Sequence, residues 1–260
     1  MPFEVVMSGF EERVAILERV IEIFTGLLPP PRFHRSARNW YFRYENPDVR
    51  HFCLLKAVRV VSALNAAFEL ARKGYSQELA ALMRILSECT RHIEYVLDPD
   101  DSEEHQGNVK RYLQDFFDDQ ERDPAAEIKG VLIREKVIND QLGKTLDKIA
   151  SLSGETQNRA VAAKLFHRSS RAFSFYVHAR YPESMDLYGG TPGRFHLHGM
   201  SGTPKDRENL ETLDTFITTA STTFLIMVQG IAELRAAALV EPALHRWYVE
   251  TVGRTSDSDG

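Results

Sequence analysis

Cysteine and long apolar runs are both scarce in this chain of 260 residues. The two cysteines, Cys53 and Cys89, cannot build a disulfide framework, so we expect two buried thiols in a reducing compartment. No basic and then apolar leader stands at the N-terminus. The longest uncharged run, between Asp214 and Glu233, is rich in threonine and too polar for a membrane span, so we expect a buried core helix there. A cytoplasmic protein without a membrane segment is therefore expected.

The chain also lacks the basic excess of proteins that bind nucleic acid over their whole surface. It has 32 Lys and Arg against 37 Asp and Glu, a formal net charge of -5. The sequence contains no P-loop, no GxGxxG after a strand, no GxSxG, no HExxH and no CxxC. Nucleotide-dependent motors, dehydrogenases, α/β-hydrolases and the familiar zinc proteases are therefore not expected.

Helical signals are frequent, and strand signals are few. Ser8 with Glu11 resembles a capping box, and apolar residues recur after it at helical spacing up to the prolines at 29–31. Further helix starts are predicted at Asn46-Pro47, at Ser76, at Asp123-Pro124 and at Ser153, and a last helix is predicted from about Asp206 to Val240, stopped by Pro242. Gly74 and Asp98-Pro99 are expected to end the second and third helices.

Glycine and proline concentrate in one stretch, residues 181–204, which contains five glycines and three prolines. This density predicts a long irregular loop, and a loop of that length is often functional. No repeat or change in composition divides the chain. We therefore predict an all-α fold, a bundle of about seven helices with one long Gly/Pro-rich loop. Residues 1–253 would form a single domain, and residues 254–260 a disordered tail.

Two basic segments stand out against the acidic net charge. Residues 32–59 combine seven basic residues with interleaved aromatic residues, and residues 159–180 contain arginines with no acid between Glu155 and Glu183. Such runs are commonly solvated faces or partners for an acidic segment, here residues 98–127. They can also bind phosphates while aromatic rings stack on the bases of single-stranded RNA. The candidate nucleic-acid-binding residues are Arg35, Arg38, Trp40 and Arg168.

Arg171 and His178 form the one candidate catalytic pair. They are seven residues apart and return to nearly the same face of a helix. A histidine can move protons near neutral pH, and an arginine can stabilise charge on a phosphate. In RNA cleavage without metal, the 2′-hydroxyl would attack the adjacent phosphate while His178 moves a proton. The alternative is a surface arginine beside an ordinary helical histidine.

The Arg-x6-His spacing of Arg171 and His178 resembles the pattern of the HEPN superfamily, helical proteins of toxin–antitoxin and phage-defence systems. A bacterial helical family of unknown function is similar over residues 52–199. Its Arg-x-Leu-x-Glu helix is matched by Arg84, Leu86 and Glu88, and its Ser-x-x-Val-His segment by Ser174, Val177 and His178. The resemblance implies a metal-independent RNase acting as a homodimer, with an antitoxin-like protein partner and no cofactor. Active members often have asparagine after the arginine, where this chain has Ala172, so a binding module remains the alternative.

Other polar groups keep further alternatives open. His196 and His198 in the glycine-rich stretch could, with His178, bind zinc for a metal-dependent hydrolase, or simply decorate an exposed loop. Arg84 and Glu88 lie on a strongly apolar helix, and if buried they should bond to partners on other helices. A non-catalytic interaction or regulatory module is the alternative that the acidic net charge favours.

Overall fold

The computed structural model describes residues 3–35, 40–117, 176–178, 180–189 and 194–257. Within these residues lie eight helices and one two-stranded sheet. The helices are α1 (Phe3–Leu27), α2 (Val49–Arg72), α3 (Ser76–Val96), α4 (Glu103–Phe117), α7 (Tyr181–Gly189), α8 (Lys205–Gly230), α9 (Ala232–Val240) and α10 (Pro242–Asp257). The strands are β1 (Arg32–Arg35) and β2 (Trp40–Arg43). The chain is thus mostly helical, as predicted, and the hairpin is an unpredicted addition.

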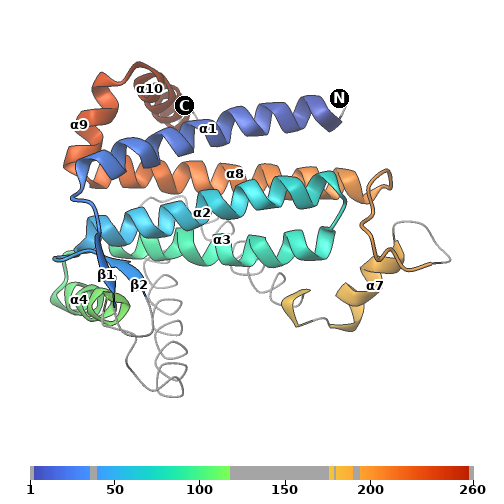
Figure 1. Ribbon diagram of the computed structural model, residues 1–260. Helices are drawn as coiled ribbons and strands as arrows, with labels where there is room; N and C mark the ends of the chain where they lie inside the picture. The colour runs from blue at the N-terminus through green and yellow to red at the C-terminus, as the bar shows by residue number, and fades with distance from the viewer. Residues whose placement is uncertain (1–2, 36–39, 118–175, 179, 190–193, 258–260) are drawn as a thin grey trace.

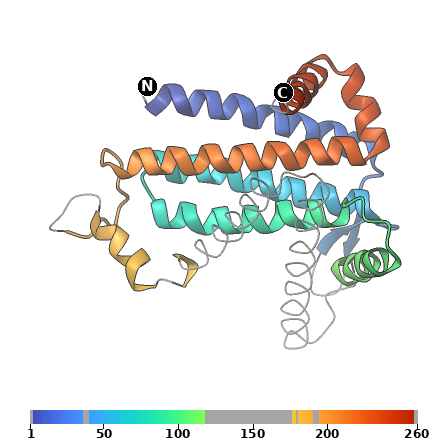
Figure 2. The same ribbon diagram turned by 180° about the vertical axis from the view of Figure 1, so that it is seen from behind.

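Four long helices, α1, α2, α3 and α8, lie side by side and form the body of the molecule (Figures 1 and 2). α8 packs against the other three, and α2 and α3 form an antiparallel pair joined by a short turn. α9 and α10 fold back onto α1. The hairpin and α4 lie at one end of this body, and α7 lies at the other (Figure 1).

α8 is the predicted core helix. Its apolar residues recur at spacings of three and four, which gives it one continuous buried face. The residues of this face are Leu213, Phe216, Ile217, Ala220, Phe224, Met227 and Val228. The hydroxyls of Thr215 and Thr219 donate to carbonyl oxygens one turn earlier, at 2.9 Å each. Thr223 is the buried threonine of this helix, and its hydroxyl donates to the Glu94 carboxylate at 2.6 Å.

The first helix begins earlier than predicted. α1 starts at Phe3, before the predicted capping residue Ser8. The reason is packing, because Met7 and Phe10 are buried and continue the apolar stripe toward the N-terminus. Burial of such side chains outweighs a local capping preference of about 1 kcal/mol.

The second helix is capped by Asp48 rather than by Asn46. The Asp48 carboxylate accepts the backbone N–H groups of Arg50 and His51, and His51 Nδ1 accepts the Asp48 N–H at 3.2 Å. This reciprocal pair satisfies donors that the helix itself leaves open. α3 begins at Ser76, as predicted, and ends at Val96.

The predicted single helix over 206–240 is two helices. α8 ends at Gly230, Ile231 takes an extended conformation, and α9 leaves at an angle of 105°. No described helix alone is long and apolar enough to cross a membrane, and α8 and α9 meet that criterion only as a bent pair. α9 ends at Val240, two residues before Pro242. Pro242 is the first residue of α10, the helix position at which proline is tolerated best. α10 continues to Asp257, into the predicted tail.

Two further helices were not expected from the sequence. α4 occupies part of the acidic segment, where the Ser102 hydroxyl accepts the backbone N–H of His105 at 3.3 Å. α7 lies inside the stretch 181–204, so the prediction of an entirely irregular loop there is wrong for residues 181–189. The high glycine content follows α7 rather than interrupting it.

The turn between α2 and α3 packs directly against the segment that precedes α8. Met200 N–H donates to the carbonyl oxygen of Gly74 at 2.8 Å. Gly74 and Gly199 have φ angles of +73° and +88°, in the left-handed region that favours glycine. A Cβ atom on Gly74 would collide with the backbone of Met200 and Ser201, and one on Gly199 would collide with Lys73. We call this backbone contact between residues 73–74 and 199–201 the glycine clasp.

Candidate nucleic-acid interface

The β1–β2 hairpin presents a pair of aromatic rings to solvent. Phe33 and Phe42 are direct partners in the antiparallel register. Their rings meet edge to face with centroids 5.6 Å apart. Yet 57% of Phe33 and 60% of Phe42 remain exposed, so the two rings support one another without entering the core. Exposed apolar rings that contact one another in this way can serve as a binding surface.

Arginines flank these rings on both strands. Arg32 is opposite Arg43 and Arg35 is opposite Trp40 in the register. Arg32 Nη1 is bridged to Glu45 at 2.6 Å, whereas Arg35 lies toward the tip and is exposed. Side chains alternate between the two faces of a strand, so Arg35 lies on the same face as Phe33. The hairpin therefore combines aromatic and cationic groups on a single face.

The hairpin is anchored at the start of α2. The Tyr44 and His51 rings meet at 4.4 Å, and His51 is buried and bonded to Asp48. Partial burial acts to raise the pKa of Asp48, but hydrogen bonds from Arg50 and His51 outweigh it and lower the pKa to about 2. Arg50 also reaches Glu233 on α9 at 2.9 Å. The aromatic pair thus projects from a base that is fixed to two helices.

The structure brings two of the predicted nucleic-acid-binding residues together. Arg35 and Trp40 are paired across the ladder. Arg38 and Arg168, and with them the predicted catalytic Arg171, lie outside the described residues. The strands themselves were missed by sequence reasoning, although the aromatic residues of 32–44 are a signal for strands.

His178 lies far from the hairpin. It is exposed, and it follows Tyr176, whose hydroxyl donates to Asp186 on α7 at 2.7 Å. α7 and the hairpin lie at opposite ends of the helical body in both views (Figures 1 and 2). The basic residues around Arg35 and the predicted catalytic His178 are therefore not part of one described site.

The three histidines proposed as metal ligands do not form a cluster. His196 is buried, and its backbone N–H donates to Leu187 at 2.8 Å, whereas His178 and His198 are exposed. Among the residues that the structure describes, no group of three His, Cys, Asp or Glu side chains is arranged to hold a metal ion. The described geometry thus offers the metal-dependent alternative no support.

Arg84 and Glu88 bond to one another along α3. Arg84 Nη2 lies 2.7 Å from Glu88 Oε1, and the two side chains are 30% and 25% exposed. We had expected such a pair, if buried, to bond to other helices. Partial exposure removes that requirement, because water can solvate the charges that the bridge leaves unsatisfied.

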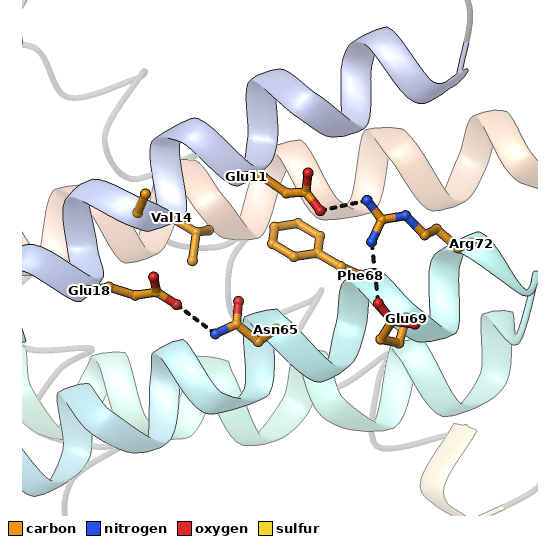
Figure 3. A pocket seen from close by; sticks show the side chains of 8 residues that line it. Glu11, Val14, Glu18, Asn65, Phe68, Glu69 and Arg72 are labelled. Carbon is orange, nitrogen blue, oxygen red and sulfur yellow. Dashed lines mark hydrogen bonds and ion pairs between the residues drawn. The ribbon is translucent and has the colours of Figure 1, made fainter.

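A polar groove of about 360 Å³ runs between α1 and α2 (Figure 3). Arg72 reaches Glu11 at 2.5 Å and Glu69 at 3.3 Å, and the Asn65 amide donates to Glu18 at 2.8 Å (Figure 3). The groove contains three carboxylates and one guanidinium, so it is unsuited to phosphate. Its polar groups instead join α1 to α2.

Sequence reasoning also missed a partly buried cationic position beside α4. Lys56 Nζ lies 5.4 Å from the Phe52 ring centroid and 4.9 Å from that of Phe116. Burial lowers the pKa of Lys56. The Phe52 and Phe116 rings meet edge to face at 4.7 Å and join α2 to α4. The aromatic surroundings of Lys56 arise only where α4 packs against α2, and the sequence near Lys56 does not reveal this contact.

The hairpin is thus the described surface with the chemistry closest to nucleic-acid recognition. It offers exposed rings, arginines and a rigid attachment, whereas the α1–α2 groove offers carboxylates. Comparisons with protein-family models, with curated proteins and with solved structures find no match for this chain. Its function must therefore be inferred from the chemistry of the described residues themselves.

Proposed function

We propose that this chain binds single-stranded RNA through the β1–β2 hairpin. The observation that carries the proposal is the Phe33–Phe42 pair, which is more than half exposed on a strand ladder that also carries arginines. Every base has an aromatic face, so exposed rings bind single strands with little dependence on sequence. Unstacked bases are far more accessible in single-stranded RNA than in a duplex.

Local charge supports the proposal despite the acidic net charge. Arg35 shares a strand face with Phe33, at a spacing that lets one side chain meet a phosphate while the other stacks on a base. The three arginines of the strands outnumber Glu45, which is bridged to Arg32. A positive patch of this kind acts locally, because charges beyond about 8–10 Å are screened at physiological ionic strength.

Replacing Phe33 with leucine is expected to weaken binding of a fluorescent 20-nucleotide poly-uridylate by about 1–3 kcal/mol, because leucine keeps apolar bulk but loses the stacking face. The replacement of Phe42 should act similarly. Fluorescence anisotropy at fixed salt measures the effect. The matched control is Val240→Ala on α9, an apolar side chain that is 81% exposed far along the chain from the hairpin.

Salt dependence separates stacking from phosphate contact. The Arg35→Gln variant should reduce the slope of log affinity against log salt concentration by about 0.7, the value for one phosphate contact on a single strand. The Phe33→Leu variant should leave that slope unchanged. Wild-type affinity for RNA in both variants would remove the hairpin from the function.

Cleavage of RNA by His178 is a second candidate function. The specific observation in its favour is that His178 is exposed, next to a segment held on α7 by the Tyr176–Asp186 bond. A general base must reach the hydroxyl proton that it removes, and an exposed imidazole on a fixed segment meets that need. Arg171, which would stabilise the developing charge, lies outside the described residues.

The test is incubation of single-stranded RNA with protein in excess EDTA. We expect the wild type to produce 2′,3′-cyclic phosphate ends and His178→Ala to produce none, with unchanged helical circular dichroism. His198→Ala is the matched control, since His198 is also exposed but two residues from the buried His196. Equal cleavage by His178→Ala would exclude His178 from the chemistry, and no cleavage by wild type would leave binding alone.

A further inference from the structure

α7 presents a second aromatic stripe, at the end of the molecule opposite the hairpin. Tyr181, Met185 and Tyr188 follow one another at spacings of four and three, so they share one face of this helix. Asp186 lies roughly on the opposite face, where it accepts the Tyr176 hydroxyl at 2.7 Å and lies 3.5 Å from Lys205 Nζ. The Asp186 side of α7 is thus attached to Lys205 of α8, and the stripe of Tyr181, Met185 and Tyr188 lies on the other side of α7.

A neighbouring segment adds a third ring, that of Phe195, to the two tyrosine rings of this stripe. The Phe195 ring meets the Tyr188 ring edge to face at 5.2 Å, and the His196 backbone N–H donates to Leu187 at 2.8 Å. Residues 194–196 are therefore fixed on α7. Even so, Tyr181 is 79% exposed and Phe195 is 53% exposed. Two rings on a fixed support remain available to a ligand.

Arginines flank these rings, although α7 itself also carries two acids, Glu183 and Asp186. Arg180 directly precedes Tyr181, Arg194 directly precedes Phe195, and both arginines are exposed. The nearest described carboxylate of α7, that of Asp186, is engaged with Lys205. Exposed aromatic rings next to arginines repeat the chemistry of the hairpin, where Phe33 shares a strand face with Arg35.

We propose that this α7 surface is a second, separate binding surface for single-stranded RNA. The inference rests on the proposed function, because it assigns the same ligand to a second place. Rings fit bases, and the adjoining arginines fit the phosphates between them. A protein partner is treated below as an outcome of the test.

The two surfaces are too far apart for a very short strand to bridge. α2, which runs between the two ends of the body (Figure 1), has 24 residues and is about 36 Å long at 1.5 Å per residue. A tetranucleotide is about 14 Å long at a stacked spacing of 3.4 Å. Each tetranucleotide can therefore occupy only one surface at a time.

The experiment uses a tetranucleotide that contains 4-thiouridine, cross-linked to the full chain by light and mapped by mass spectrometry. We expect cross-links in two separate peptides, one at the hairpin and one at residues 180–197. The double variant Tyr181→Leu/Phe195→Leu should lose only the second set, and Phe33→Leu/Phe42→Leu only the first. Circular dichroism and the thermal midpoint check that both variants are folded, and Val240→Ala serves as the exposed apolar control.

A second readout is the affinity for the 20-nucleotide strand, which can reach both surfaces. The α7 double variant should weaken it by roughly tenfold or more. Cross-links at the hairpin alone, with unchanged affinity in the α7 variant, would overturn this inference and leave the proposed function intact. If cross-links form at the hairpin alone and the α7 double variant also loses a protein that co-purifies with the wild type, α7 would be assigned to a protein partner, which would also overturn the inference. Loss of the α7 cross-links in the hairpin variant would show that the two surfaces form one shared site, and it would also overturn the inference of two separate surfaces.

Discussion

Gly74→Ala is expected to lower the free energy of unfolding by about 2–5 kcal/mol. Two effects combine in this estimate. A residue with a Cβ loses roughly 1–2 kcal/mol in the left-handed region, and overpacking against fixed atoms adds about 1–3 kcal/mol. The new Cβ meets backbone atoms of Met200 and Ser201, which cannot rotate away as a side chain could. Gly199→Ala should act similarly, because its Cβ meets the Lys73 carbonyl.

Three other glycines provide graded controls for the glycine clasp. Gly202 has a φ of +78° but nothing within 4 Å of a built Cβ, so Gly202→Ala should show the conformational effect alone. Gly9 and Gly26 lie in α1 with open space around them, and alanine there should stabilise the helix by about 0.5–1 kcal/mol. Urea unfolding followed by circular dichroism measures all five. A Gly74→Ala protein as stable as Gly202→Ala would show that the clasp is unimportant for stability.

Lowering the pH from 7 to 4 is expected to remove about 3 kcal/mol of stability through His92 alone. Burial on α3, and then the charges of Lys56 and Arg91, lower the pKa of His92 to about 3. Its Nδ1 atom is buried without a hydrogen-bond partner in the described part of the chain. An unfolded histidine takes up a proton below about pH 6.5, but the folded one does not. Each further pH unit down to about 3 therefore favours the unfolded chain by about 1.4 kcal/mol.

The variant His92→Phe isolates this contribution. Phenylalanine keeps a ring against Tyr112, which lies 5.6 Å from the His92 ring, but it has no group to protonate. Its stability advantage over the wild type should grow by about 3 kcal/mol between pH 7 and pH 4. Glu94 acts in the opposite direction, because burial raises its pKa, and comparison of the two proteins cancels it. His245→Phe on exposed α10 is the control, and a constant difference for His92→Phe would refute the assignment.

The sequence predicted the helices best where apolar periodicity and a terminating residue agreed. α3 begins at Ser76 and ends at Val96, close to the predicted limits, although Ser76 is its first helical residue and not a side-chain cap. α1 and α2 begin elsewhere than predicted, since tertiary burial of Met7 and capping by Asp48 override the nearest cap signals. No proline in the sequence marks the break at Ile231. The break depends on how α9 packs against α1.

The candidate surfaces were predicted less completely. The residues of the hairpin were identified from arginines and aromatic rings, but the alignment of Phe33 with Phe42 depends on the pairing of β1 with β2. The α7 surface was hidden inside a stretch interpreted as loop, because its glycines dominated the pattern. Phe195 reaches Tyr188 only through the fold, and no periodicity in the sequence relates the two.

The glycine clasp also bears on the lifetime of the folded state. The α2–α3 pair is local and can form early, whereas the clasp joins that turn to residues far along the chain. Such a contact must await closure of a long loop, so it should form after the rate-limiting step of folding. Interactions that form late slow unfolding and leave the folding rate unchanged. The two glycines would then set how long the protein stays folded rather than how fast it folds.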